Sequence, residues 1–182
     1  MLGTILNTCF DILAYLIVVL IILGVYADFM RWKRKKEIIV VDMGLMFDIL
    51  PIIKRGVMWA ENNKGKTLND YLKAHLSEAM PFAETIIKAI KYQQAGYTLV
   101  FYTEMPNCLR VQLAKHLNDW KLAGELYLNF NDDFGDAAQF REIFIREVSR
   151  KKGMKIVGII DSYRLSNKQA DKYYAEKGIK VC

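Results

Sequence analysis

The stretch IIVVD at residues 38–42 decides the fold, because it is a short β-branched run that ends on an aspartate. Two later stretches have the same form: TLVFYT at residues 98–103 ends on Thr103, and KIVGIID at residues 155–161 ends on Asp161. Apolar runs of this length, bounded by polar residues, are typical of buried strands in a parallel sheet. The three runs therefore predict one sheet with polar residues along its carboxyl edge.

Two weaker strand signals and four helical patterns fill the rest of the chain. The strand signals are residues 126–128 and 179–181. Three helical patterns are stripes of apolar residues: Phe82, Ile86, Ile87 and Ile90, then Leu109, Leu113 and Leu117, then Phe140, Phe144 and Val148. A last helix is capped by Ser166 or Asn167 and closed by Gly178. Strands that alternate with helices predict an α/β fold of three layers, with helices on both faces of a mainly parallel sheet.

Residues 48–80 do not fit this alternation, and we interpret them as an insertion between the first strand and the first long helix. Residues 48–59 are apolar and contain Pro51. A polar turn, ENNKGKT, follows at residues 61–67, and residues 68–76 have a helical pattern. Such an insertion serves either as a small cap or flap over the strand ends or as a surface for a partner.

Residues 12–26 (ILAYLIVVLIILGVY) contain no charged side chain and indicate a membrane-spanning helix. With the flanking apolar residues, the stretch reaches the length of about 20 residues that a helix needs to cross a bilayer. A cleaved signal peptide would have basic residues before the apolar run, but the basic run RWKRKK at residues 31–36 follows it. A core helix would have a polar face. We therefore expect a retained single-span anchor, with the lipid bilayer as a partner.

The same basic run predicts the orientation of the anchor, because basic flanks favour the cytoplasmic side. The N-terminus is expected outside, and everything after Met30 in the cytoplasm or a mitochondrial matrix. The membrane is accordingly a bacterial or a mitochondrial inner membrane. The predicted organisation is an anchor at residues 1–30, a basic juxtamembrane linker at residues 31–37 and a soluble domain at residues 38–182.

The net charge of +6 does not by itself indicate nucleic-acid binding. Half of it belongs to the membrane flank, where cations meet anionic lipid headgroups, and the rest of the chain carries about +3. The three cysteines and two histidines are isolated in sequence, which argues against a disulfide framework and a histidine-based metal site. Nucleic acid is therefore not an expected partner.

The polar residues at the predicted strand ends suggest phosphate chemistry. Two aspartates at the tips of neighbouring parallel strands, Asp42 and Asp161, offer the oxygen ligands that suit Mg²⁺ with water and a phosphate. Thr103 can donate its hydroxyl to a phosphate oxygen, and one aspartate can attack phosphorus. The alternative is that each residue merely starts a turn and caps the next helix.

The order and spacing of these stretches resemble the haloacid dehalogenase (HAD) superfamily over about residues 38–181. The matching stretches are IIVVDMG, LVFYT and VGIID. The C-terminal half, residues 80–181, also looks similar to the 3′-phosphatase domains of polynucleotide kinases and to the membrane-anchored HAD domains of the mitochondrial presequence translocase. The resemblance implies that Asp42 holds the nucleophile position, Thr103 the phosphate-binding hydroxyl and Asp161 a metal ligand. It also implies that the backbone carbonyl of Gly44 is a metal ligand.

The chain departs from this family at three catalytic positions. Active phosphatases carry a general acid two residues after the nucleophile, where this chain has Gly44, and Asp48 lies too far along to replace it. A lysine is expected before the fourth strand, and only Arg141 is near that place. The paired acids of the fourth motif are reduced to Asp161 and Ser162. These losses together argue against efficient phosphate hydrolysis.

The sequence therefore predicts a membrane-anchored, catalytically inactive HAD-like protein that serves as an accessory or scaffold subunit of a membrane complex, such as a respiratory or translocase assembly. Its expected partners are the bilayer and the other subunits of that complex. The alternative is a Mg²⁺-dependent phosphatase that acts on nucleotides or nucleic-acid ends, with Asp42 as nucleophile. A third hypothesis is a phosphate or nucleotide sensor that keeps Mg²⁺ without chemistry.

Overall fold

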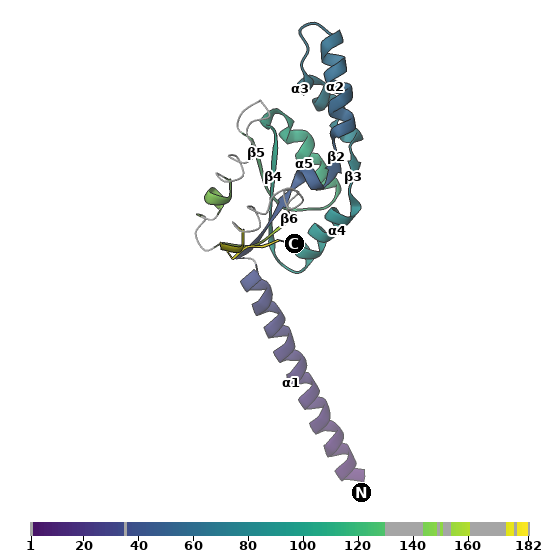
Figure 1. The fold of residues 1–182 in the computed structure, drawn as a ribbon. Helices are drawn as coiled ribbons and strands as arrows, with labels where there is room; N and C mark the ends of the chain where they lie inside the picture. The colour runs from purple at the N-terminus through teal and green to yellow at the C-terminus, as the bar shows by residue number, and fades with distance from the viewer. Residues whose placement is uncertain are drawn as a thin grey trace.

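A parallel sheet of five strands, in the order β5-β4-β1-β6-β7, forms the body of the molecule (Figure 1). The structure, a computed structural model, describes residues 2–34, 36–129, 144–148, 150, 154–160, 174–176 and 178–181. The strands are β1 (Glu37–Asp42), β4 (Thr98–Pro106), β5 (Gly124–Asn129), β6 (Lys155–Ile160) and β7 (Lys180–Val181). All four of their pairings are parallel. The α/β fold and each strand expected from the sequence are confirmed.

Alternate residues of the central strands face two separate cores, which is what produces the three layers. Ile39 and Phe101 pack on one side with buried residues of α4 (Ala83–Gln94) and α5 (Arg110–Asp119). Val40 and Tyr102 pack on the other side with Phe144, Val148 and Tyr174. Because side chains alternate between the two faces along a strand, helical residues pack on both faces of the sheet.

The helical patterns are confirmed as far as the structure describes them. The first two correspond to α4 and α5. Residues 144–148 and 174–176 are helical. Phe140, Ser166 and Asn167 lie outside the described residues, so the start of each of these two helices stays a prediction.

Strand β4 is longer than the sequence indicated, because it continues past Thr103 to Pro106. The register against β5 shifts between these two residues, and Pro106 then pairs with Asn129. Strand β4 continues to Pro106 because β5 runs beside it as far as Asn129. The apolar residues of one strand do not indicate how far its neighbour extends. A short helix, η3 (Asn107–Leu109), then leads into α5.

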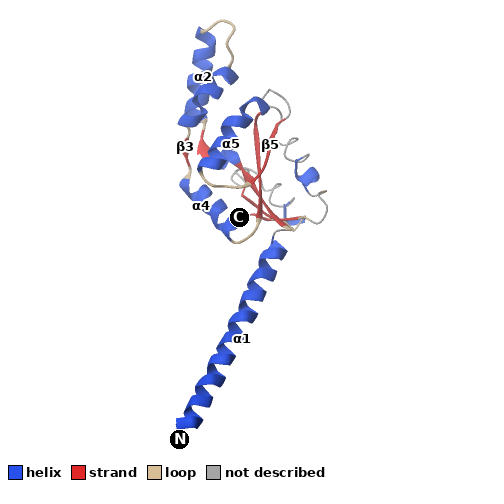
Figure 2. Cartoon of the chain, turned by 180° about the vertical axis from the view of Figure 1, so that it is seen from behind, coloured by secondary structure: helices blue, strands red, loops and turns tan. Residues whose placement is uncertain are grey.

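The insertion is a helical hairpin on a small two-stranded base. It contains η1 (Met43–Leu45), β2 (Phe47–Asp48), α2 (Leu50–Asn62), α3 (Leu68–His75), η2 (Leu76–Glu78) and β3 (Met80–Pro81). Strands β2 and β3 pair antiparallel. Figures 1 and 2 show α2 projecting beyond the sheet, with β3 and α4 below it along one flank. The hairpin therefore extends the body without covering the whole edge of the sheet.

Local sequence explains where the two insertion helices begin and how closely they pack. Pro51 lies in the first turn of α2, where its missing N–H costs nothing. Thr67 and Asp70 form a capping box at the start of α3. Gly56 permits close packing, since a Cβ there would lie 2.7 Å from Leu68 Cδ1 and 2.8 Å from Tyr71 Cδ1.

The N-terminal helix α1 (Leu2–Arg34) stands apart from the body (Figure 1). Its segment Ile12–Lys33 is long and apolar enough to span a membrane, and none of the span is buried inside the molecule. This exposure excludes a core helix. A signal sequence passes the same test of length and composition, so the membrane anchor and its orientation stay predictions.

The end of α1 meets the amino edge of the sheet. A Cβ on Gly96, in the turn between α4 and β4, would lie 3.3 Å from Arg31 Cγ. Lys36, just after α1, accepts a hydrogen bond at 2.8 Å through its carbonyl from the N–H of Lys155, where β6 begins. Because the strands are parallel and start beside α1, their carboxyl ends point away from it.

Candidate functional site

Asp42 is the last residue of β1, and its side chain is only 7% exposed. Its carboxylate oxygen Oδ1 accepts a hydrogen bond of 2.8 Å from the N–H of Gly44. This contact caps η1, as an aspartate at a turn commonly does. The carboxylate at the predicted nucleophile position therefore also has a structural role.

Thr103 lies on β4, next to β1, and is 2% exposed. Asp42 pairs with Tyr102 across the two strands, so Thr103 is one residue further toward the same carboxyl edge. Its hydroxyl accepts a hydrogen bond of 3.3 Å from the N–H of Met105. Within the described ranges, Asp42 and Thr103 are the only buried polar side chains. Burying polar groups is costly unless they are hydrogen-bonded, and each of these side chains accepts a hydrogen bond here. Their roles in phosphate chemistry stay predictions.

Gly44 lies directly against the carboxylate of Asp42. A Cβ at this position would be 3.1 Å from Asp42 Oδ1, which is tight enough to require a local shift. Any side chain here would change the Asp42–Gly44 contact. Asp48, the nearest downstream carboxylate, accepts a hydrogen bond of 3.1 Å from the N–H of Leu50 at the start of α2.

The structure brings Asp42, Gly44 and Thr103 to one edge of the sheet and leaves the other predicted site residues untested. Asp161 and Arg141 lie outside the described residues. Ile160 pairs with Val41 and is the last described residue of β6. No group of three His, Cys, Asp or Glu side chains able to hold a metal ion is found in the described part of the chain. The predicted Mg²⁺ site, which requires Asp161, stays a prediction.

Electrostatic contacts in the insertion hold its helices together. Glu78 accepts hydrogen bonds from His75 Nδ1 at 2.6 Å and from Arg55 at 2.8 Å, which join α2, α3 and η2. These hydrogen bonds lower the pKa of the Glu78 carboxyl, with His75 as the larger cause. The backbone and the hydroxyl of Thr67 likewise lower the pKa of Asp70. These contacts stabilise the insertion and lie outside the Asp42 edge.

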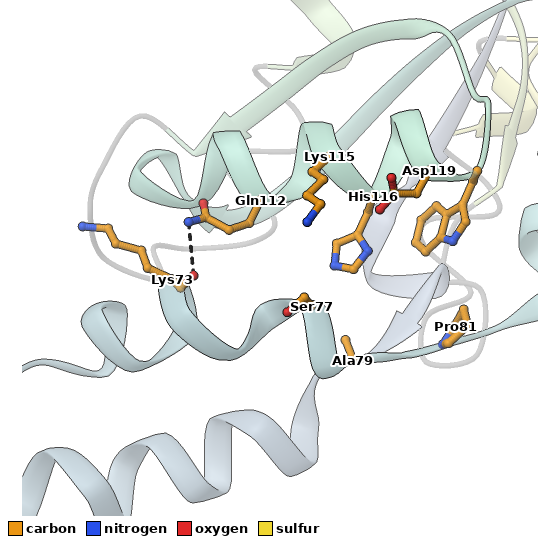
Figure 3. Close-up of a pocket in the computed structure, with 9 residues that line it drawn as sticks. Lys73, Ser77, Ala79, Pro81, Gln112, Lys115, His116 and Asp119 are labelled. Atoms are coloured by element: carbon orange, nitrogen blue, oxygen red, sulfur yellow. Dashed lines mark hydrogen bonds between the residues drawn. The ribbon is translucent and has the colours of Figure 1, made fainter.

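Sequence reasoning missed a groove between residues 77–81 and one face of α5 (Figure 3). The spacing of Gln112, Lys115 and Asp119 could have placed them on one helix face. No signal in the sequence shows that η2 and β3 lie opposite that face, because these segments are distant along the chain.

Comparison with known proteins yields a likeness of fold. No protein-family model matches the chain, and no curated protein matches it. A chain of the Pnkp1/Rnl/Hen1 complex aligns over 81% of this chain and 45% of its own length, with a TM-score of 0.53 and 13% identity. A chain of the Pnkp1/Rnl/Hen1 RNA repair complex aligns over 81% and 42%, with a TM-score of 0.55 and 13% identity. The chain thus spans less than half the length of these solved relatives, and at this identity the likeness shows the fold alone.

Proposed function

We propose that this chain is a membrane-anchored HAD-fold protein that acts as an accessory or scaffold subunit of a membrane complex and does not hydrolyse phosphate esters efficiently. The observation that carries the proposal is the Asp42–Gly44 contact. Where an active phosphatase of that superfamily has a second carboxylate, this chain has a glycine whose N–H is bound to Asp42 Oδ1 at 2.8 Å.

The chemical consequence is the loss of leaving-group protonation. A positioned general acid contributes about 10²–10⁴-fold to a rate. At the place where the resemblance to that superfamily expects a lysine, the sequence has Arg141. Without the general acid, the leaving alkoxide receives no proton from the protein. Without the lysine, the expected cation beside the nucleophile and the phosphate is also missing. Such a site is suited to binding more than to turnover.

The predicted anchor would place the accessory protein at a membrane. The apolar span Ile12–Lys33 holds the chain in a bilayer, with the N-terminus outside and the α/β domain in the cytoplasm or matrix. The basic flank after the span supports this orientation. A bacterial inner membrane and a mitochondrial inner membrane both fit, and in either the domain would contact the subunits beside it.

A second candidate is a Mg²⁺-dependent phosphatase that acts on nucleotides or nucleic-acid ends, with Asp42 as nucleophile. The observation that favours it is the likeness of fold to chains solved in an RNA repair complex. Asp42 and Thr103 would then bind the phosphate, and Asp161 and the carbonyl of Gly44 would hold Mg²⁺.

One assay separates the two candidates. The full-length chain, purified in mild detergent, is incubated with Mg²⁺ and either p-nitrophenyl phosphate or a 3′-phosphorylated oligonucleotide. The Asp42→Asn variant is the matched control, because its side-chain oxygen can still accept the hydrogen bond from Gly44. Equal release of phosphate by both proteins is expected. Release that the variant abolishes would replace the accessory role with the phosphatase.

A further inference from the structure

Almost no chain separates α1 from the sheet. Helix α1 ends at Arg34 and β1 begins at Glu37, so only two residues connect them. Lys36, the second of these, donates through its N–H to the carbonyl of Lys33 at 3.1 Å, and its own carbonyl accepts from the N–H of Lys155 at 2.8 Å. These bonds tie the end of α1 to the first residues of β1 and β6. The sheet therefore begins directly at the end of the helix, without a free linker.

This short connection limits how far the sheet can lie from a membrane. The span Ile12–Lys33 has 22 residues and a length of about 33 Å, close to the hydrocarbon thickness of about 30 Å. The headgroup layer adds about 5–8 Å on each side. A helix that crosses the bilayer here therefore brings the first residues of β1 and β6 into that layer. Figures 1 and 2 show α4 at the same end of the body and α2 at the opposite end.

The side chains around this junction include four exposed cations from three elements. Arg31 and Lys33 belong to the last turn of α1, Lys91 belongs to the last turn of α4, and Lys155 is the first residue of β6. None of the four forms an ion pair with another described residue. The ends of α1 and α4 meet at Gly96, just after α4, where a Cβ would lie 3.3 Å from Arg31 Cγ.

Carboxylates balance only part of this charge. Glu37 lies beside Lys155 in the register of β1 and β6, and Asp28 lies on α1 about one turn before Arg31. Lys36 adds a fifth exposed cation between the helix and the sheet. Five cations against two carboxylates leave an excess of three positive charges at the end of the span. Such an excess attracts anionic lipid, and the attraction decays over a screening length of about 8–10 Å.

An aromatic pair lies at the same level of α1. Phe29 and Trp32 are 55% and 57% exposed, and their ring centroids are 6.2 Å apart. The ammonium group of Lys36 lies over the Trp32 ring, 4.3 Å from its centroid. Tryptophan rings favour the boundary between acyl chains and headgroups, so this contact holds the Lys36 ammonium at headgroup level. A cation at that level suits the phosphate of an anionic lipid.

We propose that the amino-edge surface, defined as Arg31, Lys33, Lys36, Lys91 and Lys155, binds the anionic headgroups of the bilayer that α1 crosses. The α/β domain is then held against the membrane in one orientation. The inference rests on the membrane anchor of the proposed function, and it adds a lipid contact made by the domain itself. A bilayer fits this surface better than a nucleic acid does, because the headgroups beside the span cover the same edge.

The test measures which lipid lies beside Trp32 when the full-length chain is inserted into vesicles. The vesicles mix phosphatidylcholine with phosphatidylglycerol, and one lipid or the other carries brominated acyl chains, which quench the fluorescence of a nearby tryptophan. Trp32 is exposed on α1, whereas Trp59 and Trp120 are half-buried in the body and supply a constant background. Flotation with vesicles of phosphatidylcholine alone checks that the anchor inserts.

Two double variants separate the domain from the flank of the helix. Lys91→Gln with Lys155→Gln removes the two cations that the domain contributes and keeps those of α1. Lys54→Gln with Lys64→Gln makes the same change of charge at exposed positions of α2 and of the turn after it, at the end of the body opposite to α1 (Figure 1).

We expect phosphatidylglycerol to be enriched about fivefold over phosphatidylcholine beside Trp32 at about 0.1 M salt. The enrichment should fall about twofold or more in the Lys91–Lys155 variant and stay unchanged in the Lys54–Lys64 variant. Equal quenching by the two lipids, or the same enrichment in both variants, would overturn the proposal.

Two further outcomes have distinct meanings. Labelled single-stranded DNA that binds the chain in phosphatidylcholine vesicles, and that only the Lys91–Lys155 variant fails to bind, would assign the surface to nucleic acid and overturn the proposal. A chain that floats with phosphatidylcholine vesicles and shows no enrichment contradicts the lipid contact and leaves the anchor standing. A chain that floats with no vesicle contradicts the predicted anchor, and the lipid contact with it.

Discussion

At the scale of single residues, the contact between Asp42 and Gly44 fixes the carboxylate at the end of β1, because the N–H of Gly44 binds its Oδ1. The positions of Asp42 and Thr103 at the ends of apolar runs were predictable from the sequence. The 2.8 Å hydrogen bond that engages the carboxylate could not be foreseen, because it depends on the turn that follows β1. Arg141 and Asp161 stay predictions from sequence alone.

Replacing Gly44 by aspartate should destabilise the protein more than replacing it by asparagine. Both side chains bring a Cβ to 3.1 Å from Asp42 Oδ1, but only aspartate adds a second negative charge. Repulsion between the two carboxylates raises their pKa in the folded state of Gly44→Asp. The loss of folding stability is therefore fully present above that raised pKa. It disappears below about pH 3.9, the pKa of an aspartate in the unfolded chain.

Denaturant unfolding of both Gly44 variants across this pH range measures the difference. We expect about 1 kcal/mol lower stability for Gly44→Asp than for Gly44→Asn near neutral pH, and equal stability in acid. Equal stability of the two variants at neutral pH would contradict the close approach of residue 44 to the Asp42 carboxylate.

Gly124 should be intolerant of any side chain, for a reason that is steric. A Cβ there would lie 2.5 Å from the carbonyl oxygen of Leu99 and 2.7 Å from Phe101 Cε2, and the strand backbone cannot move aside. We expect Gly124→Ala to lower the free energy of unfolding by about 2–3 kcal/mol. Gly65→Ala, at a φ of +79° in open space, should cost only about 1 kcal/mol. The reverse ranking in a thermal melt would contradict the β4–β5 packing.

At the scale of elements, the strands and long helices were predictable because their apolar residues have a clear period. The two-residue strands β2 and β3 are too short to have one, and they exist because the insertion closes on itself through the Phe47–Pro81 pair. The extension of β4 to Pro106 depends on its neighbour β5. The groove beside α5 depends on tertiary packing between η2, β3 and α5, so no local pattern indicates it.

The insertion should become less stable in acid through Glu78. Hydrogen bonds from His75 and Arg55 lower its pKa in the folded state, so the stabilisation is present above the ordinary pKa of 4.5 and is lost as the pH falls through the lowered value. Glu78→Gln should therefore flatten the loss of stability between neutral and acid pH. Glu61→Gln, an exposed change on α2, is the control. Hydrogen exchange of α3 amides measures the effect, and identical acid profiles for Glu78→Gln and wild type would refute it.

At the scale of the whole molecule, the connection between α1 and the sheet determines which edge of the sheet lies near α1 and which lies far from it. Strand β1 begins beside α1, and the contact between Arg31 and Gly96 lies at the amino edge. Six residues of β1 carry the chain about 20 Å away from the anchor. The Asp42 edge therefore lies at the end of the sheet that points away from α1.

A retained anchor has a direct biochemical consequence. Full-length chain expressed in cells should stay in the membrane pellet after alkaline carbonate washing, because a spanning helix is held by the bilayer and not by charge. Its mass should equal that of the intact chain, 21.1 kDa. A shortened chain in the soluble fraction would mean that the apolar segment is a cleaved signal sequence.

The accessory role is tested most directly by the native mass of the protein in its own membrane. Membranes are solubilised in mild detergent and separated by native electrophoresis, and the band that contains this chain is analysed by mass spectrometry. We expect one defined assembly with the same partner subunits in fixed proportion, unchanged by Asp42→Asn. A chain that migrates alone, at 21.1 kDa plus its detergent, would contradict the accessory role.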